Sequence, residues 1–261
     1  MQLPTINEIL KNGEVTLIVP KNGGGLSKEV HLAIYQGEKY ILRQCKEDNA
    51  DRLEYYLDEI GSYSFTPTLY ERNNNDLLLE FIDGNELTLD NPENVARELG
   101  RISGIVANIP PQYQARPENR FSSDLDYLIA NNIINNSKRK QIQSRYNQLR
   151  PETIESRTEL NDIIPSNFMI KQGKIYLTDI DAISTWLKGG VFAKAFLNWF
   201  TTDEQKDLFL QGYEESQDTK FLTQNYLQFI NLSFGVFKAR QWHKRGVSII
   251  KPLRWIKESL T

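Results

Sequence analysis

The chain has little of what proteins use for covalent cross-links or histidine chemistry. Its 261 residues include one cysteine, Cys45, so no internal disulfide can form and nothing requires an oxidising compartment. There are two histidines, His31 and His243, and neither lies in a segment with candidate catalytic groups. Ser-His-Asp catalysis and histidine-based metal hydrolysis are therefore disfavoured.

Long apolar runs and a strong charge imbalance are also missing. No window of about 18 residues is apolar and uncharged enough to cross a membrane. The N-terminal sequence, MQLPTINEILKNGE, lacks the basic stretch and apolar run of a secretory signal. The formal net charge is -3, so nucleic-acid binding is not expected of the chain as a whole. These absences predict a soluble cytoplasmic protein.

The hydrophobic pattern changes character after Gly84. We predict an α+β fold of two lobes, a small β-rich N-terminal lobe over residues 1–84 and a larger, mainly helical C-terminal lobe over residues 85–261, with a hinge near 80–86. Clefts between two lobes are common ligand sites. Strands are expected at 14–19, 29–35, 39–43, 68–72 and 77–82, and helices at 49–60, 91–107, 122–131, 137–149 and over most of the chain after 191.

The first candidate for chemistry is a glycine-rich segment between two expected strands. Glycines let the backbone approach a phosphate closely and donate N–H groups to it. Taken alone, such a segment is more often a hairpin turn. Its residues are Gly23, Gly24, Gly25, Leu26 and Ser27.

Arg43, which closes the third expected strand, is the second candidate. A guanidinium group can bind phosphate oxygens in a bidentate way. The helix that follows offers Glu54 or Glu59 as a carboxylate partner. Each of the three residues, taken alone, is more often exposed to solvent.

The third and fourth candidates lie close together in the sequence. Asp162 is followed by Asn167, then by a short hairpin, and then by Asp179 at the end of an apolar strand. Phosphoryl transfer needs a carboxylate that holds the acceptor hydroxyl, and oxygen ligands that hold magnesium against the nucleotide phosphates. In this order and spacing, the residues favour phosphoryl transfer over capping or turn roles.

These segments resemble the aminoglycoside phosphotransferase and choline kinase superfamily over residues 12–215. The segments 161–168 and 177–181 are similar to its His-Asn/Gly-Asp-x-x-x-x-Asn and Ile-Asp-Phe/Trp-Asp/Glu patterns. The resemblance implies a protein-kinase-like fold and an ATP- and Mg2+-dependent phosphotransferase that acts on a hydroxyl group. The implied acceptor is a small molecule, either an amino alcohol such as choline, a sugar or an aminoglycoside.

The resemblance also assigns roles to individual residues. Asp162 would orient the acceptor hydroxyl as the catalytic residue, and Asn167 and Asp179 would bind magnesium. Arg43, oriented by Glu54, would hold the nucleotide phosphates. The remaining assignments are Gly23, Gly24, Gly25 and Ser27 over the phosphates, Glu80 and Ile82 on adenine through their main chains, and Asp181 and Trp186 near the substrate.

Two positions depart from the family pattern. Leu160 stands where the family has a histidine two residues before the catalytic aspartate, and Val106 stands where a helix usually ends in Leu-His. These departures leave a second hypothesis open, a kinase-fold binding module that has lost catalysis.

The C-terminal region does not determine which acceptor or which partners the chain binds. Several acidic and aromatic residues lie where the family builds its acceptor pocket, and they would suit a cationic acceptor, although each residue taken alone is more often part of a helix core or a solvated acid. They are Trp186, Trp199, Phe200, Tyr213, Glu214, Glu215, Tyr226 and Phe229. The basic aromatic tail, residues 234–261, could contact an anionic membrane surface, an anionic acceptor or a partner, or could pack on the body with a solvated basic face. A kinase of a membrane glycolipid or protein is therefore a further alternative.

Overall fold

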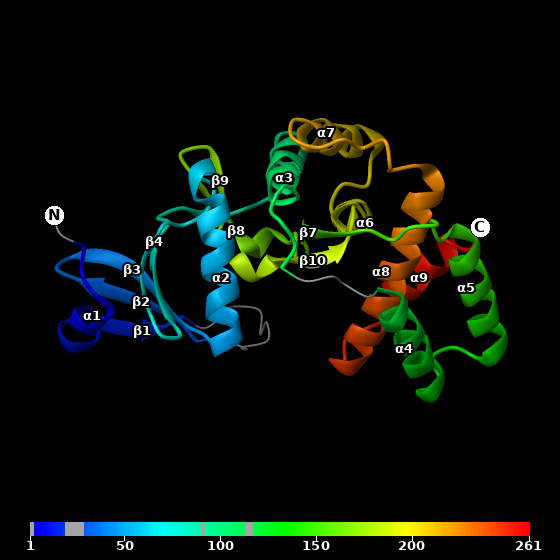
Figure 1. Cartoon of the computed structure of the whole chain (residues 1–261), viewed down its shortest axis with the longest axis horizontal. Coiled ribbons are helices and arrows are strands. Elements are labelled where there is room, and N and C mark those ends of the chain that lie inside the picture. Colours follow the sequence, from blue (N-terminus) through cyan, green and yellow to red (C-terminus); the bar gives the residue numbers. More distant parts are fainter. Residues whose placement is uncertain (1–2, 19–28, 90–91, 113–116) are drawn as a thin grey trace. The chain divides into compact units, whose positions relative to one another are not determined.

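The computed structural model describes residues 3–18, 29–89, 92–112 and 117–261, and the chain divides into two compact units (Figure 1). Unit 1 comprises residues 1–88 and 164–181, and unit 2 comprises residues 89–163 and 182–261. The α+β class is confirmed, with an antiparallel sheet followed by a mainly helical part. The contacts group residues 164–181 with unit 1, whereas the predicted lobe boundary near residue 84 placed them in the second lobe.

Unit 1 is built on a five-stranded antiparallel sheet with the order β1-β2-β3-β5-β4. Gln36 and Gly37, with φ angles of 53° and 85°, form the tight turn that joins β2 to β3. All five expected strands are present, with ends shifted by a few residues. Their bounds are β1 (Glu14–Leu17), β2 (Glu29–Tyr35), β3 (Glu38–Gln44), β4 (Leu69–Asn73) and β5 (Asp76–Glu80).

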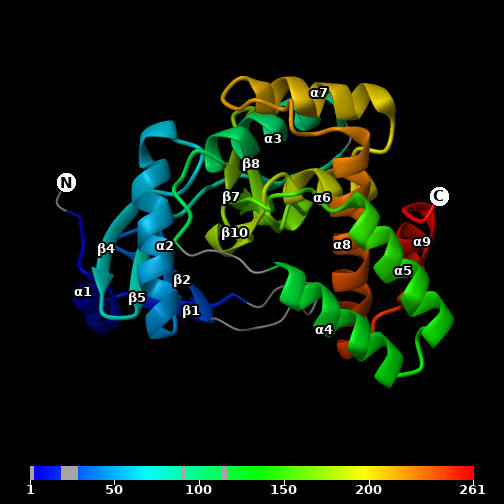
Figure 2. The same cartoon turned by 45° about the vertical axis from the view of Figure 1, so that its right-hand side comes forward.

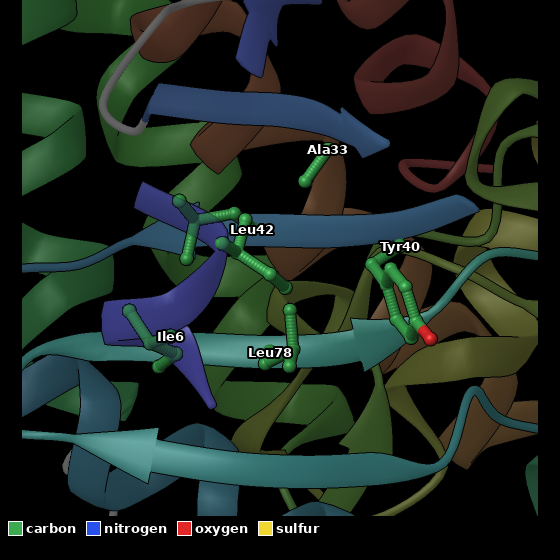
Figure 3. Close-up of a cluster of buried hydrophobic side chains, with 6 residues drawn as sticks. Ile6, Ala33, Tyr40, Leu42 and Leu78 are labelled. Carbon is green, nitrogen blue, oxygen red and sulfur yellow. The ribbon is translucent and has the colours of Figure 1, made fainter. Parts of the chain in front are cut away.

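A short helix that the sequence analysis missed, α1 (Ile6–Asn12), packs on this sheet. Thr5 and Glu8 form a capping box, in which each side chain accepts a hydrogen bond from the backbone N–H of the other residue. Ile6 belongs to a buried cluster with Ala33, Tyr40, Leu42 and Leu78 of the sheet (Figure 3). The Thr5-x-x-Glu8 spacing was the sequence signal that could have revealed this helix.

A second, three-stranded sheet completes unit 1 and carries part of the candidate site. Its order is β6-β8-β9, and Gln172 and Gly173 form the β8–β9 turn with φ angles of 52° and 77°. Gly84 lies so close to Ile170 that a Cβ atom would come within 2.5 Å of the Ile170 carbonyl oxygen. The remaining elements of unit 1 are α2 (Glu47–Ile60), η1 (Gly61–Tyr63), β6 (Asn85–Glu86), η2 (Pro165–Asn167), β8 (Phe168–Lys171) and β9 (Lys174–Leu177), and η3 (Ile180–Ala182) spans the change to unit 2.

Unit 2 is mainly helical, with one two-stranded sheet. Helix α8 packs against α4, α5, α6 and α9 (Figure 2). Helices α3 and α7 approach closely at Gly100 and Gly212, where a Cβ atom would lie 2.0 and 1.9 Å from backbone oxygens of the facing helix. The bounds are α3 (Pro92–Val106), α4 (Pro117–Ala130), α5 (Asn136–Leu149), β7 (Ser156–Leu160), β10 (Ile183–Leu187), α6 (Gly190–Asn198), α7 (Asp203–Glu214), α8 (Gln224–Lys244) and α9 (Ile250–Glu258).

The basic aromatic tail folds back as part of unit 2. Gly246, with a φ angle of 68°, lies between α8 and α9, so the tail is not one continuous helix. The Trp255 ring is 2% exposed and stacks on Phe234 with 5.6 Å between ring centroids. Apolar packing of this segment is therefore confirmed. Within the described residues, no helix is long and apolar enough to cross a membrane.

Candidate functional site

One group of candidate site residues lies in unit 1, where the chain leaves β9. The backbone N–H groups of Thr178 and Asp179 donate to the Asn167 carbonyl oxygen at 2.9 and 3.4 Å. The Asp181 N–H in turn donates to Asp179 Oδ1 at 3.3 Å. These backbone bonds place two predicted metal ligands, Asn167 and Asp179, side by side.

Arg43 on β3 is the cation at the centre of this arrangement. It is 5% exposed, and its Nη2 lies 3.3 Å from Asp179 Oδ1 and also donates to Asp181. Asp181 binds a second guanidinium as well, that of Arg52 on α2. The Arg43 Nε is buried and has no hydrogen-bond partner among the residues described. A buried donor without a partner costs free energy, so this atom is suited to an anionic ligand oxygen.

The expected pair between Arg43 and Glu54 is not formed. Glu54 binds Arg72 on β4 instead. Residues two positions apart on a helix point about 200° apart, because each residue turns the helix by about 100°. Since Arg52 faces Asp181, Glu54 faces away from it. Sequence reasoning missed Arg52 because no motif separates it from the other charged residues of α2.

Two predicted adenine contacts lie at the end of β5. The Glu80 N–H donates to the Thr68 carbonyl at 2.9 Å, and the Glu80 carboxylate accepts from Thr68 Oγ1 at 3.1 Å. Glu80 lines a pocket of about 320 Å³ with Thr66, Thr68 and Tyr176, among others. Ile82 is buried, and its carbonyl accepts from Gly84. The predicted phosphate-covering residues Gly23, Gly24, Gly25 and Ser27 lie outside the described residues.

Another group of candidate site residues lies in unit 2, where the chain leaves β7. The Asp162 N–H donates to the Ala182 carbonyl at 3.1 Å, and the Asn161 side chain donates to the Ser184 carbonyl at 2.9 Å. Leu160, which stands where the resembling family has a histidine, is fully buried and pairs with Ile183 of β10. An apolar side chain at this position thus packs in the core while the backbone after it holds the Asp162 turn.

A buried carboxylate that sequence reasoning missed lies one residue before Leu160. Glu159 accepts backbone N–H groups from Gly189 at 2.7 Å and Val191 at 3.2 Å, at the start of α6. Burial raises the pKa of Glu159 to about 7, although these hydrogen bonds oppose the shift. The burial of Glu159 could not be predicted from its residue type, because an isolated glutamate in a strand is usually exposed.

The raised pKa of Glu159 predicts a pH dependence of stability. Between pH 4.5 and 7 the folded chain keeps a proton that the unfolded chain has lost, so the free energy of unfolding falls as the pH rises. The fall from this group is about 3 kcal/mol. Urea unfolding between pH 4.5 and 7 should show a flatter dependence in Glu159→Gln. The exposed Glu152→Gln variant should keep the wild-type slope, and equal slopes in all three proteins would contradict the assignment.

The predicted acceptor residues separate into two groups in unit 2. Trp186 on β10 is partly exposed and contacts Phe237, with 5.9 Å between ring centroids. Glu215 is bound by Arg97, and Glu214 accepts from Thr219. Phe200, Tyr213 and Phe229 are fully buried, so core packing accounts for these three aromatics.

The chain resembles known proteins at the level of structure. No protein-family model and no curated protein sequence matches the chain. Solved structures do match. Choline kinase LicA from Streptococcus pneumoniae superposes with a TM-score of 0.66 at 14% identity, over 97% of this chain and 94% of LicA. An ethanolamine kinase from Plasmodium vivax gives a TM-score of 0.66 at 12% identity, over 98% of this chain and 84% of that one.

Antibiotic phosphotransferases match as well. The spectinomycin phosphotransferase APH(9)-Ia, solved with ADP and spectinomycin, gives a TM-score of 0.65 at 11% identity, over 94% of this chain and 88% of that one. The chain therefore has the kinase-like fold shared by choline kinases and aminoglycoside phosphotransferases. This confirms the fold that the sequence resemblance implied.

Proposed function

We propose that the chain is an ATP- and Mg2+-dependent phosphotransferase that acts on a hydroxyl group of a small molecule. The observation that carries the proposal is the backbone arrangement that holds Asn167 beside Asp179. The shared fold supports it, since several proteins with this fold are phosphotransferases and one was solved with ADP. Fold alone does not determine function, so the proposal depends on these side chains.

The residues of unit 1 fit a magnesium nucleotide. The Asp179 side chain is 42% exposed and the Asp181 side chain 12%, so Asp179 offers the more accessible carboxylate. Carboxylate and amide oxygens suit magnesium, which when bound supplies positive charge against the nucleotide phosphates. The buried Nε of Arg43 fits a phosphate oxygen. Gly23, Gly24, Gly25 and Ser27 are proposed to cover the phosphates, and Glu80 and Ile82 to meet adenine through their main chains.

Asp162 in unit 2 is proposed to orient the acceptor hydroxyl and to take its proton. The acceptor oxygen forms a bond to the γ-phosphorus of ATP while the bond from that phosphorus to the β–γ bridging oxygen breaks, and ADP leaves. The Asp162 turn is fixed by its backbone bond to Ala182, so the carboxylate is held in place before the acceptor binds.

Thermal unfolding with ATP, with and without magnesium, tests the nucleotide site. Magnesium-dependent stabilisation of about 2.7 kcal/mol is expected when the ligand concentration is 100 times Kd. Asp179→Asn should remove the magnesium-dependent part, whereas Asp203→Asn, with a side chain 97% exposed, should keep it. Equal stabilisation of wild type and Asp179→Asn would contradict the assignment.

The second candidate, a binding module without catalysis, is favoured by one observation. Leu160 and Val106, which both replace family histidines, are fully buried. Release of ADP in the presence of acceptors separates the two candidates. Stabilisation by magnesium-ATP with no ADP release for any choline, sugar, aminoglycoside, glycolipid or protein acceptor would favour the binding module.

A further inference from the structure

Three cations from different helices of unit 2 gather around shared aromatic rings. The Arg120 guanidinium of α4 lies 4.1 Å from the Phe237 ring centroid and 4.7 Å from that of Trp186. Lys238 Nζ of α8 lies 5.6 Å from the ring centroids of both Phe237 and Phe234, and Lys194 Nζ of α6 lies 5.9 Å from that of Phe234. We call Arg120, Lys194 and Lys238 the basic cluster.

The charges of the two lysines in this cluster are poorly compensated, whereas Arg120, with a side chain 45% exposed, lies 4.0 Å from the Asp124 carboxylate. Within the described part of the chain, neither Lys194 nor Lys238 forms an ion pair, and Lys238 donates only to the neutral side chain of Gln241. Burial lowers the pKa of both lysines, that of Lys194 to about 7, and repulsion from Arg120 adds to the shift of each. Like charges placed together away from water cost free energy unless an anion binds among them.

The proposed catalytic aspartate, Asp162, acts electrostatically on the two lysines of the basic cluster. The Asp162 carboxylate is close enough to raise the pKa of both Lys194 and Lys238, against the effect of burial. The Glu159 carboxylate also attracts Lys194, but it is already bound by two backbone N–H groups. Two lysines that form no ion pair among the described residues therefore lie within electrostatic reach of Asp162, the residue that is proposed to orient the acceptor hydroxyl.

We propose that the basic cluster is the anion-binding part of the acceptor site, and that the acceptor is a hydroxyl compound bearing a phosphate or carboxylate group. This inference rests on the proposed phosphotransferase function. Charge-assisted hydrogen bonds from lysine and arginine bind such anions, and the same charges repel cationic acceptors such as choline and aminoglycosides. The expectation of a cationic acceptor rested partly on Glu214 and Glu215, which are exposed and engaged with Thr219 and Arg97.

Calorimetric binding without nucleotide tests the cluster directly. Glucose 6-phosphate and glucuronate should bind more tightly than glucose or choline, and inorganic phosphate should compete with them. Lys194→Gln and Lys238→Gln should each weaken binding of the anions about tenfold, because each removes one charge-assisted contact. Lys220→Gln, at a side chain 91% exposed, is the matched control and should bind as wild type does. Lys194→Arg should retain binding, which separates loss of charge from misfolding.

The source of the anion is distinguished by a parallel arm. Vesicles that contain phosphatidylinositol, compared with vesicles of phosphatidylcholine alone, report on a lipid headgroup that carries both phosphate and hydroxyls. The inference is supported if any of these anions binds more tightly than its uncharged or zwitterionic counterpart, and if this difference is lost in both Lys194→Gln and Lys238→Gln. Equal binding of glucose and the anions, or anion binding unchanged in both variants, would overturn it.

Failure of the inference is separable from failure of the proposed function. ADP release with choline or glucose but not with the anions would leave the phosphotransferase function standing and refute the anionic acceptor. Anion binding that depends on Lys194 and Lys238, in a protein that magnesium-ATP does not stabilise, would support the anion site and refute the phosphotransferase function.

Discussion

Asp162→Asn is expected to lower the rate of phosphoryl transfer by a factor of about 10² to 10⁴, the range typical of a lost general base. Asparagine keeps the shape of the side chain but cannot take a proton. The backbone bond from residue 162 to the Ala182 carbonyl is unchanged, so the turn after β7 should keep its conformation. The measurement is kcat for ADP formation with a saturating acceptor.

Nucleotide binding gives the internal control for this variant. The proposed nucleotide contacts at Arg43, Asn167 and Asp179 belong to unit 1, whereas Asp162 belongs to unit 2. Stabilisation by magnesium-ATP should therefore be the same in wild type and Asp162→Asn. The catalytic assignment fails if turnover persists at the wild-type rate. It also fails if the variant loses nucleotide stabilisation, because the effect on turnover would then be indirect.

Trp255→Ala is expected to lower the free energy of unfolding by about 3–5 kcal/mol, the usual cost of removing a large buried aromatic side chain. Trp255 stacks on Phe234 and also contacts Trp242, with 6.1 Å between ring centroids. Its loss leaves a cavity between α8 and α9. Urea unfolding followed by circular dichroism measures the change.

A matched position on the same helix provides the control. Ile250 is 78% exposed, so Ile250→Ala should change the free energy of unfolding by no more than about 0.5 kcal/mol. This pair also tests the role of the tail. A tail that detaches to bind elsewhere would not depend on Trp255, so a loss below about 1 kcal/mol would mean that α9 is not an integral part of unit 2.

The sequence predicted the structure best where functional residues lie close together along the chain. The segment from Asp162 to Asp181 carries its residues at fixed spacings, and both the fold and the neighbourhood of Asn167 and Asp179 followed from it. The strands of unit 1 were predictable because apolar and β-branched residues mark them. Helix α1 was missed because it is only 7 residues long, too short for a periodic pattern, although its capping box was present.

Contacts between distant residues were beyond the reach of sequence patterns. Arg43 binds Asp181 across 138 positions, and nothing near Glu54 shows that it binds Arg72. The basic cluster could not be predicted either, because Arg120, Lys194 and Lys238 lie on three helices whose packing no motif specifies. The acidic and aromatic residues of the C-terminal region even suggested a cationic acceptor, since the sequence does not show where charges gather in the fold.

Residues 164–181 belong to unit 1, although residues 89–163 separate them from the rest of that unit in the sequence. This separation affects the order in which the chain folds. Proteins made on the ribosome usually complete their N-terminal domain first. Here the N-terminal 88 residues lack the β8–β9 hairpin that pairs with β6, and they lack both aspartates that bind Arg43. The first unit therefore closes only after residues 89–163 have been synthesised. During synthesis, the Arg43 guanidinium of β3 cannot pair with Asp179 and Asp181 until residue 181 has left the ribosome.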